Sequence, residues 1–170
     1  ERVGKSGSKF DPEKTKWFNQ QYLRKRTDEE LADIWMKDLE AQNISADKKY
    51  VVQAVSLIKE KAVFSNEFSA LGNFFFKDPE VYDADVIKKR WNEDAKKFLA
   101  EVKNNFANLS DFSAAETEKC FKETAAAMSL NPGQFMQLFR VVVSGLAGGP
   151  VLFDMVALLG KVTITNRIDL

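Results

Sequence analysis

Apolar residues recur at intervals of three or four along most of the chain, a spacing that places them on one face of an α-helix. The clearest repeat is Leu31, Trp35 and Leu39. Only two short runs, at 141–143 and 162–164, lean toward strand, and each is too short to build a sheet. The pattern therefore predicts an all-α fold.

Capping residues and helix breakers divide this pattern into separate helices. The helix from Asp83 is expected to run without a break to about Asn105. Gly145 and Gly160 are expected to end the helices that precede them, because glycine is the preferred residue just past a helix end. The expected helices begin at Asp11, Thr27, Ser45, Ser65, Asp83, Ser113, Asn131 and Pro150, with a last helical turn at 165–170.

The strongest interruption of the helical pattern is Lys77-Asp78-Pro79. Proline disfavours helix at the residue before it, so the chain is expected to change direction there. A length of 170 residues suits one domain or two small ones that share a core. We therefore predict two packed helical subdomains, at 1–78 and 79–170.

The composition is that of an ordinary globular protein, and it excludes several kinds of chemistry. Hydrophobic residues make up 45% of the chain, and 25 basic side chains balance 25 acidic ones. A nucleic-acid-binding role must therefore rest on local patches. The chain has no histidine and one cysteine, Cys120, which excludes cysteine–histidine zinc sites and mechanisms with a histidine base. We predict no metal site and no catalytic residue, and the single cysteine suits a reducing compartment.

The first predicted helix mixes aromatic and basic residues. Trp17, Phe18 and Tyr22 follow two lysines, and the helix ends in the basic run 24–26. Aromatic rings beside cations suit a nucleic-acid backbone. Aromatic residues at helical spacing, however, more often form a stripe that faces the core. We predict that this stripe packs inside the protein.

Residues 131–161 hold two apolar runs around the small-residue turn at 145–150. The 20 residues from 141 to 160 carry a single charge and match the length of a membrane span. Glycines and a proline in mid-span break one helix into two, and Asp154 would cost about 3 kcal/mol at the membrane centre. Two short buried helices are therefore predicted.

Arg140 lies alone between these apolar runs and needs a partner. Asp154 or Glu116 would form an ion pair with it inside the chain, and the alternative is a group on a ligand. The carboxylates fall in helix caps and on exposed faces, so no catalytic constellation can be assembled. The residues alone favour a helical binding module, or a protein–protein interaction module with 141–160 as its hydrophobic interface, over an independent enzyme.

Motifs at both ends resemble bacterial glutamyl-tRNA synthetases, in the region just beyond their catalytic domain. The N-terminal motif comprises Glu1-Arg2-Val3, Ser6, Lys9 to Lys14, Lys16 to Asn19 and Tyr22-Leu23-Arg24. The C-terminal motif comprises Leu138 to Val141, Ser144-Gly145, Gly149-Pro150, Leu152-Phe153-Asp154, Leu158 to Lys161 and Arg167-Ile168. Shorter matches at 28–32, 59–61 and 74–76 fall between them in the family's order, so the resemblance covers nearly the whole chain.

The resemblance implies the anticodon-binding part of a class I aminoacyl-tRNA synthetase, built from two helical subdomains. The family joins glutamate to its tRNA through a glutamyl-adenylate, with ATP and Mg²⁺, on a nucleotide-binding domain. That domain bears an HIGH-type signature, which a chain without histidine lacks. The implied piece is therefore non-catalytic and without a cofactor of its own. Its implied partner is the anticodon loop of glutamate tRNA, and neither DNA nor a membrane, within a monomeric cytoplasmic enzyme.

The resemblance also implies which residues contact the anticodon. Arg140 matches an arginine that reads the first base. Gly149, Pro150 and Leu152 match positions that line the first and second bases, partly through the backbone. Where the family has threonine this chain has Gly149, so a hydroxyl contact is replaced by backbone or shape contacts.

The third base is read by an arginine in some family members. Lys61 is the nearest match to that arginine, and Lys59 is the other choice. Lysine lacks the bidentate fork of arginine, so discrimination at this base is expected to differ from that of members with arginine.

Overall fold

A computed structural model describes residues 12–169 of the chain. These residues form α-helices and short 3-10 helices and include no strand, which confirms the all-α prediction. The predicted helix cap Asp11 lies outside the described residues. The elements are α1 (Pro12–Lys25), α2 (Asp28–Ala41), α3 (Lys48–Ile58), η1 (Lys59–Lys61), η2 (Ser65–Glu67), α4 (Phe68–Gly72), η3 (Asn73–Phe75), α5 (Ala84–Arg90), α6 (Glu93–Asn108), α7 (Ala114–Ala127), α8 (Gly133–Ser144), α9 (Leu152–Leu159) and α10 (Lys161–Arg167).

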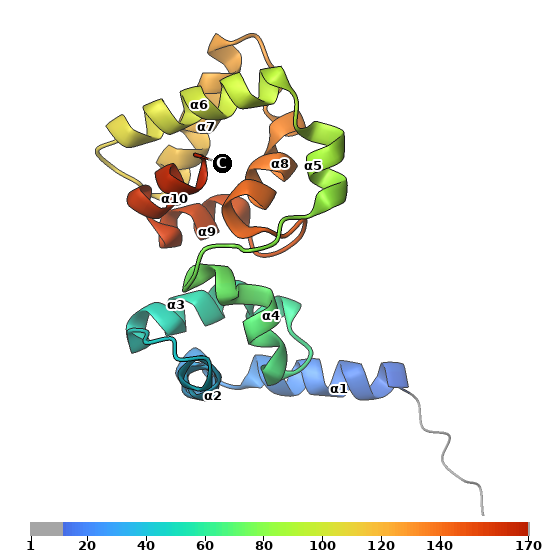
Figure 1. Ribbon diagram of the computed structural model, residues 1–170. Helices are drawn as coiled ribbons and strands as arrows, with labels where there is room; N and C mark the ends of the chain where they lie inside the picture. The colour runs from blue at the N-terminus through green and yellow to red at the C-terminus, as the bar shows by residue number, and fades with distance from the viewer. Residues whose placement is uncertain (1–11, 170) are drawn as a thin grey trace, which may run out of the picture.

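The helices lie in two groups, which Figure 1 shows one above the other. The N-terminal group holds α1 to α4, the C-terminal group holds α5 to α10, and the connecting segment, residues 76–83, contains no helix. The segment includes the predicted break at 77–79. Buried apolar side chains of both groups form one connected core. The division into subdomains at 78/79 therefore stays a prediction.

Local sequence signals set most helix ends. At the start of α2, the Thr27 hydroxyl accepts from the Glu30 amide and the Glu30 carboxylate accepts from the Thr27 amide, both at 3.2 Å. This capping box satisfies two amide groups that have no partner inside the helix. At the end of α8, Gly145 takes a left-handed conformation with φ of 78°, which glycine adopts without steric penalty.

One predicted helix is in fact two. The run expected from Asp83 to Asn105 is interrupted at Trp91 and Asn92, between α5 and α6. The Asn92 side chain accepts a hydrogen bond from the Ala95 amide at 2.9 Å and so begins α6. Asparagine is among the strongest N-cap residues, and here that preference overrides the continuous apolar repeat.

Two further boundaries differ from expectation. The helix expected at Pro150 begins two residues later, at Leu152, and the β-leaning run 162–164 lies inside α10. Packing decides the second case, because Ile164 is fully buried against the core. Tertiary contacts commonly override the weak local preference of β-branched residues.

The prediction that the aromatic stripe of α1 faces the core was wrong. Trp17, Phe18 and Tyr22 are 55%, 56% and 60% exposed. The second half of α1 is held by the buried side chain of Leu23 and by an ion pair of 2.7 Å between Arg24 and Glu60 of η1. Figure 1 shows the rest of the helix projecting from the N-terminal group. No other described element therefore lies over this aromatic face.

The apolar runs of 141–160 are folded into the core as parts of α8 and α9. Among the described residues, no helix is both long and apolar enough to cross a membrane. This burial also gives no support to the protein–protein interface predicted as the alternative for these residues. Their side chains pack against the protein's own aromatic residues, such as Phe121 with Phe139 and with Phe153.

Candidate functional site

The site is built around the corner between α8 and α9, defined here as residues 145–151. Its geometry begins in the last turn of α8. The Ser144 hydroxyl donates to the Arg140 carbonyl at 2.7 Å and accepts from the Leu146 amide at 3.2 Å. One side chain therefore ties the helix end to the first residues of the corner.

Arg140 is held against the corner by the main chain. Its Nη1 donates to the Pro150 carbonyl at 2.7 Å, across the mouth of the turn. The side chain is half-buried, and this burial lowers the pKa of the guanidinium from its ordinary value. The pKa is lowered because a charge kept away from water is less stable. The guanidinium is still charged near neutral pH.

Of the two alternatives for Arg140, the structure does not show the ion pair with Asp154 or Glu116. Asp154 is exposed in the first turn of α9, and Glu116 lies 3.9 Å from Lys119. None of the ion pairs found within residues 12–169 includes Arg140. Its neighbour in the structure is a backbone carbonyl, which the sequence does not mark. Arg140 is therefore a half-buried cation without a compensating carboxylate in the described chain.

Gly149 lies directly beside the guanidinium. Its φ is 149°, in a region that residues with a side chain rarely adopt. A Cβ atom at this position would lie 3.4 Å from Nη1 of Arg140, which is ordinary contact. The backbone conformation, and not lack of space, is therefore what requires glycine here. The structure brings Arg140, Gly149 and Pro150 together, and their contact with an anticodon stays a prediction.

Two of the predicted residues at the corner are buried. Pro150 is buried beside Arg140, and Leu152 is 7% exposed and packs in the core as the first residue of α9. Neither side chain is therefore exposed at the surface of the corner. The exposed apolar side chain here is Val151, at 67%, which the sequence reasoning missed. The signal was present, because Val151 follows Pro150 outside the periodic run of α9.

Lys61 lies in η1, on the N-terminal group, and is exposed. No hydrogen bond or ion pair within the described chain joins it to the corner. Lys59 is held in place, because its Nζ donates to the Arg26 carbonyl at 2.6 Å and to Asp28 Oδ1 at 3.0 Å. The Lys59 side chain is 15% exposed. Of the two lysines, Lys61 is the one whose ammonium group is accessible.

A hollow of about 570 Å³ borders the corner at Ala147. It lies against the last turn of α5, which carries the exposed side chain of Lys89. Arg90, beside it, is anchored by its Nη1 to the Gln134 carbonyl at 3.0 Å. These two cations are balanced by two carboxylates, Asp83 and Asp85, in the lining of the same hollow. The other residues lining this hollow are Val86 and Gln137.

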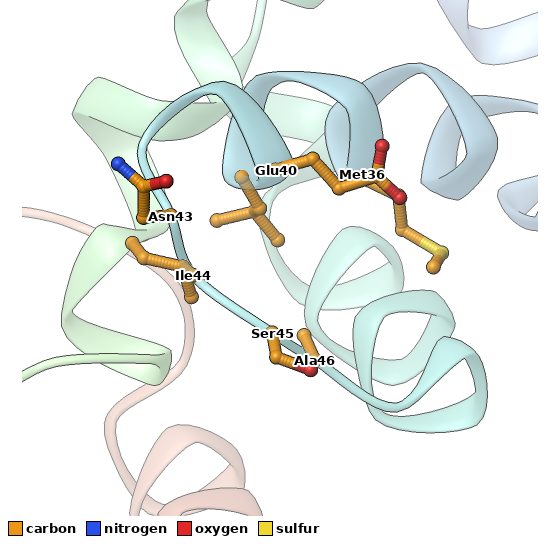
Figure 2. A pocket seen from close by; sticks show the side chains of 7 residues that line it. Met36, Glu40, Asn43, Ile44, Ser45 and Ala46 are labelled. Atoms are coloured by element: carbon orange, nitrogen blue, oxygen red, sulfur yellow. The ribbon is translucent and has the colours of Figure 1, made fainter.

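A separate pocket of about 320 Å³ lies at the connection between α2 and α3 (Figure 2). Figure 2 shows Met36 and Glu40 on the helix and Asn43 to Ala46 along the loop. The pocket is lined only by residues of the N-terminal group, and none of them is a predicted site residue. We assign it no role in the site around the corner.

No group of three or more cysteine, aspartate or glutamate side chains within residues 12–169 is arranged to hold a metal ion. Cys120 is partly buried in α7, and burial raises the pKa of its thiol. A raised pKa reduces the thiolate fraction, which is the reactive form. The Cys120 side chain packs against the hydrophobic core.

A helical protein with an accessible arginine at a glycine corner is consistent with the RNA-binding class inferred from the end motifs. The profile of the anticodon binding domain family matches residues 20–170. The chain belongs to the anticodon-binding domain family.

The similar proteins are glutamate–tRNA ligases, which confirms the resemblance found in the sequence. The ligase of Flavobacterium johnsoniae is 41% identical over 168 residues, covering 99% of this chain and 33% of the relative. That of Christiangramia forsetii is 37% identical over 169 residues, covering 99% and 34%. The chain therefore spans about a third of the length of these relatives.

Solved structures show the same relationship. A glutamate tRNA ligase from Elizabethkingia meningosepticum, in complex with its amino acid, superposes with a TM-score of 0.86 at 31% identity. The match covers 94% of this chain and 32% of that one. A glutamate-tRNA synthetase from Elizabethkingia anophelis gives a TM-score of 0.82 at 30% identity, covering 94% and 31%.

Proposed function

We propose that this chain recognises the anticodon loop of glutamate tRNA as part of a glutamate–tRNA ligase. The observation that carries the proposal is Arg140, a half-buried cation held by the Pro150 carbonyl with no carboxylate opposite it. Burying a charge is unfavourable unless it is paired. A base edge rich in acceptors, presented by an unpaired RNA loop, would supply the missing partner.

The corner gives such a base room to approach. Gly148 is exposed, and a Cβ added there would meet nothing within 4 Å. Val151 offers an exposed apolar surface beside the arginine. In this proposal Arg140 hydrogen-bonds the first anticodon base, while Gly149, Pro150 and the backbone of Leu152 line the first and second bases.

Lys61 is the proposed contact to the third base, since Lys59 is occupied by Asp28 and the Arg26 carbonyl. Lysine provides a mobile point charge and not a planar fork. Recognition of the third base is therefore expected to be looser than that of the first. A Lys61→Arg variant tests this directly, because it restores the fork at the same position.

The whole ligase would attach glutamate to tRNA with ATP and Mg²⁺. The relatives are about three times as long as this chain, and the catalytic chemistry is proposed to lie in the part of them that the chain does not span. The described residues do not fit a Mg²⁺ site, because no acidic cluster is present among them. We therefore assign no reaction step to this chain. The parent enzyme is proposed to be a cytoplasmic monomer.

Binding of anticodon stem-loops, measured by fluorescence anisotropy, tests the proposal. We expect Arg140→Ala to weaken binding to the glutamate anticodon loop by about 1–3 kcal/mol, because a base contact is lost. Loops with a changed first base should be affected much less, since they lack that contact already. Arg140→Lys keeps the charge and serves as the matched control.

Equal loss for all loops would reduce Arg140 to a phosphate contact, and Arg140→Lys would then bind like the wild type. Failure of the wild-type chain to distinguish the glutamate anticodon from any single-base variant would refute the proposal. The titration should be repeated at several salt concentrations, because phosphate contacts weaken steeply with salt while base discrimination does not.

A further inference from the structure

Arg167, in the last turn of α10, is a charged side chain buried at the joint between the two helix groups. It is 5% exposed, which is unusual for arginine. Its Nε donates to Oδ1 of Asp78 at 2.9 Å, and its Nη2 donates to the carbonyls of Phe74 and Lys77 at 2.8 and 3.1 Å. These three acceptors belong to the end of the N-terminal group and to the connecting segment.

The remaining arm of Arg167 reaches the C-terminal group. Nη1 donates to the Val143 carbonyl at 2.6 Å. Val143 lies in the last turn of α8, where carbonyls have no partner inside the helix. The Phe74 carbonyl lies likewise at the end of η3. One guanidinium therefore binds two helix ends, where a positive charge is favourable.

The charge of Arg167 affects the pKa of tyrosines on both sides of the joint. Burial raises the pKa of Tyr50 in α3, and the positive charge of Arg167 opposes part of that rise. The same opposition acts on Tyr82 in the connecting segment. No other described arginine or lysine is as fully buried.

The geometry points to Arg167 as a positioning residue that fixes Lys61 on the N-terminal group relative to Arg140 on α8. Arg167 binds α8 one turn beyond Arg140, at Val143, and it binds the N-terminal group at Phe74. A rigid joint lets both contacts form on one RNA loop without an additional ordering cost. This inference rests on the proposed function.

Arg167→Lys tests the inference, because lysine keeps the charge but cannot span both groups with a planar fork. The readout is the loss of loop affinity caused by Lys61→Ala, measured in two backgrounds. In the wild type we expect a loss of roughly tenfold, typical of one charged hydrogen bond. In the Arg167→Lys background we expect less than about threefold, because the two contacts are no longer coupled.

Asp78→Ala is the second variant, since the Asp78 side chain is 82% exposed and its removal leaves no cavity in the core. This variant removes one of the four hydrogen bonds of Arg167. The affinity lost through Lys61→Ala should therefore be smaller than in the wild type, but not as small as in the Arg167→Lys background. Residual dipolar couplings of the whole chain give the orientation of the two helix groups without RNA. In both variants the couplings should no longer fit one rigid orientation of the two helix groups, while the helical content stays unchanged.

The outcomes separate the inference from the function on which it rests. If the wild-type chain does not discriminate between anticodons, the proposed function fails. The inference is wrong if the wild-type chain does discriminate but Lys61→Ala causes the same loss of loop affinity in the wild-type, Arg167→Lys and Asp78→Ala backgrounds. It is also wrong if Lys61→Ala causes no loss of affinity in the wild type. Should Arg167→Lys not fold, an unchanged Lys61→Ala loss in Asp78→Ala would overturn it.

Discussion

At the scale of single residues, the conformation of Gly149 shapes the corner. The resemblance leads one to expect threonine at this position, whereas this chain has a glycine with φ of 149°. A residue with a side chain at this position would require a different backbone conformation, because residues with a Cβ rarely adopt this φ. A hydroxyl at this position would therefore need a different backbone as well as a side chain.

We expect Gly149→Ala to lower the free energy of unfolding by roughly 1–3 kcal/mol, because alanine disfavours this φ. Gly148→Ala is the matched control, since Gly148 has no positive φ and nothing within 4 Å of a Cβ. That variant should be unchanged or slightly more stable. Urea unfolding followed by circular dichroism measures both, and equal effects at the two positions would contradict this account.

Part of the site could be predicted from single residues, and part could not. Arg140 stood out because a lone charge inside an apolar run requires an explanation. Its partner, the Pro150 carbonyl, is main chain, and every residue carries the same carbonyl group. The burial of Leu152 in the first turn of α9 follows the apolar pattern of that helix, but the resemblance alone did not indicate it.

At the scale of helices, Asn92 decides how the chain leaves α5. The side chain of Asn92 satisfies the Ala95 amide, which would otherwise lack a partner at the start of α6. We expect Asn92→Ala to lower the free energy of unfolding by about 1 kcal/mol. Asn92→Asp, which can accept the same bond, should retain most of the stability. Thermal unfolding of the two variants compares them, and similar melting temperatures would argue against the cap.

Most helices could be predicted from periodicity and caps, because both act over a few neighbouring residues. Thr27 and Gly145 mark their helix ends in the sequence as clearly as in the structure. The split at Asn92 was missed, because the apolar repeat continues across it. The exposure of Trp17 was missed for another reason: helical spacing gives a face its apolar character but not the element that covers it.

At the scale of the whole molecule, Gly145 holds the connecting segment against α8. Its carbonyl accepts from the Asp83 amide at 2.9 Å. A Cβ on Gly145 would lie 2.5 Å from the Val81 carbonyl oxygen and 3.1 Å from Cβ of Pro79. Glycine is required here by close approach as well as by φ.

Gly145→Ala and Gly160→Ala compare a crowded glycine with an uncrowded one. Both have positive φ, but Gly145 is left-handed with ψ of −16°, whereas Gly160 has ψ of 161° and nothing within 4 Å of an added Cβ. We expect Gly160→Ala to lose about 1–3 kcal/mol from backbone strain alone, and Gly145→Ala to lose about 1–2 kcal/mol from the left-handed conformation plus about 1–3 kcal/mol from overpacking. Denaturant titration gives both values, and a loss for Gly145→Ala no larger than its backbone part would mean that the segment moves aside freely.

The bond network of Arg167 could not be predicted at this scale. Three of its four acceptors lie about 90 positions from Arg167 and the fourth lies 24 positions away, and the three that are backbone carbonyls carry no sequence signature. The break at 77–79 was visible because proline acts locally. What spans the break depends on the packed arrangement of α8, α10 and η3.

The projecting helix α1 has an optical consequence. The chain has three tryptophans, and Trp35 is fully buried while Trp91 is partly covered and Trp17 lies largely in solvent. Indole emission shifts to longer wavelength in water, so Trp17 contributes the red edge of the spectrum and is the ring most open to a soluble quencher. Anything that covers the aromatic face of α1 would therefore change the intrinsic fluorescence of the chain, and α1 carries its own unlabelled reporter of that event.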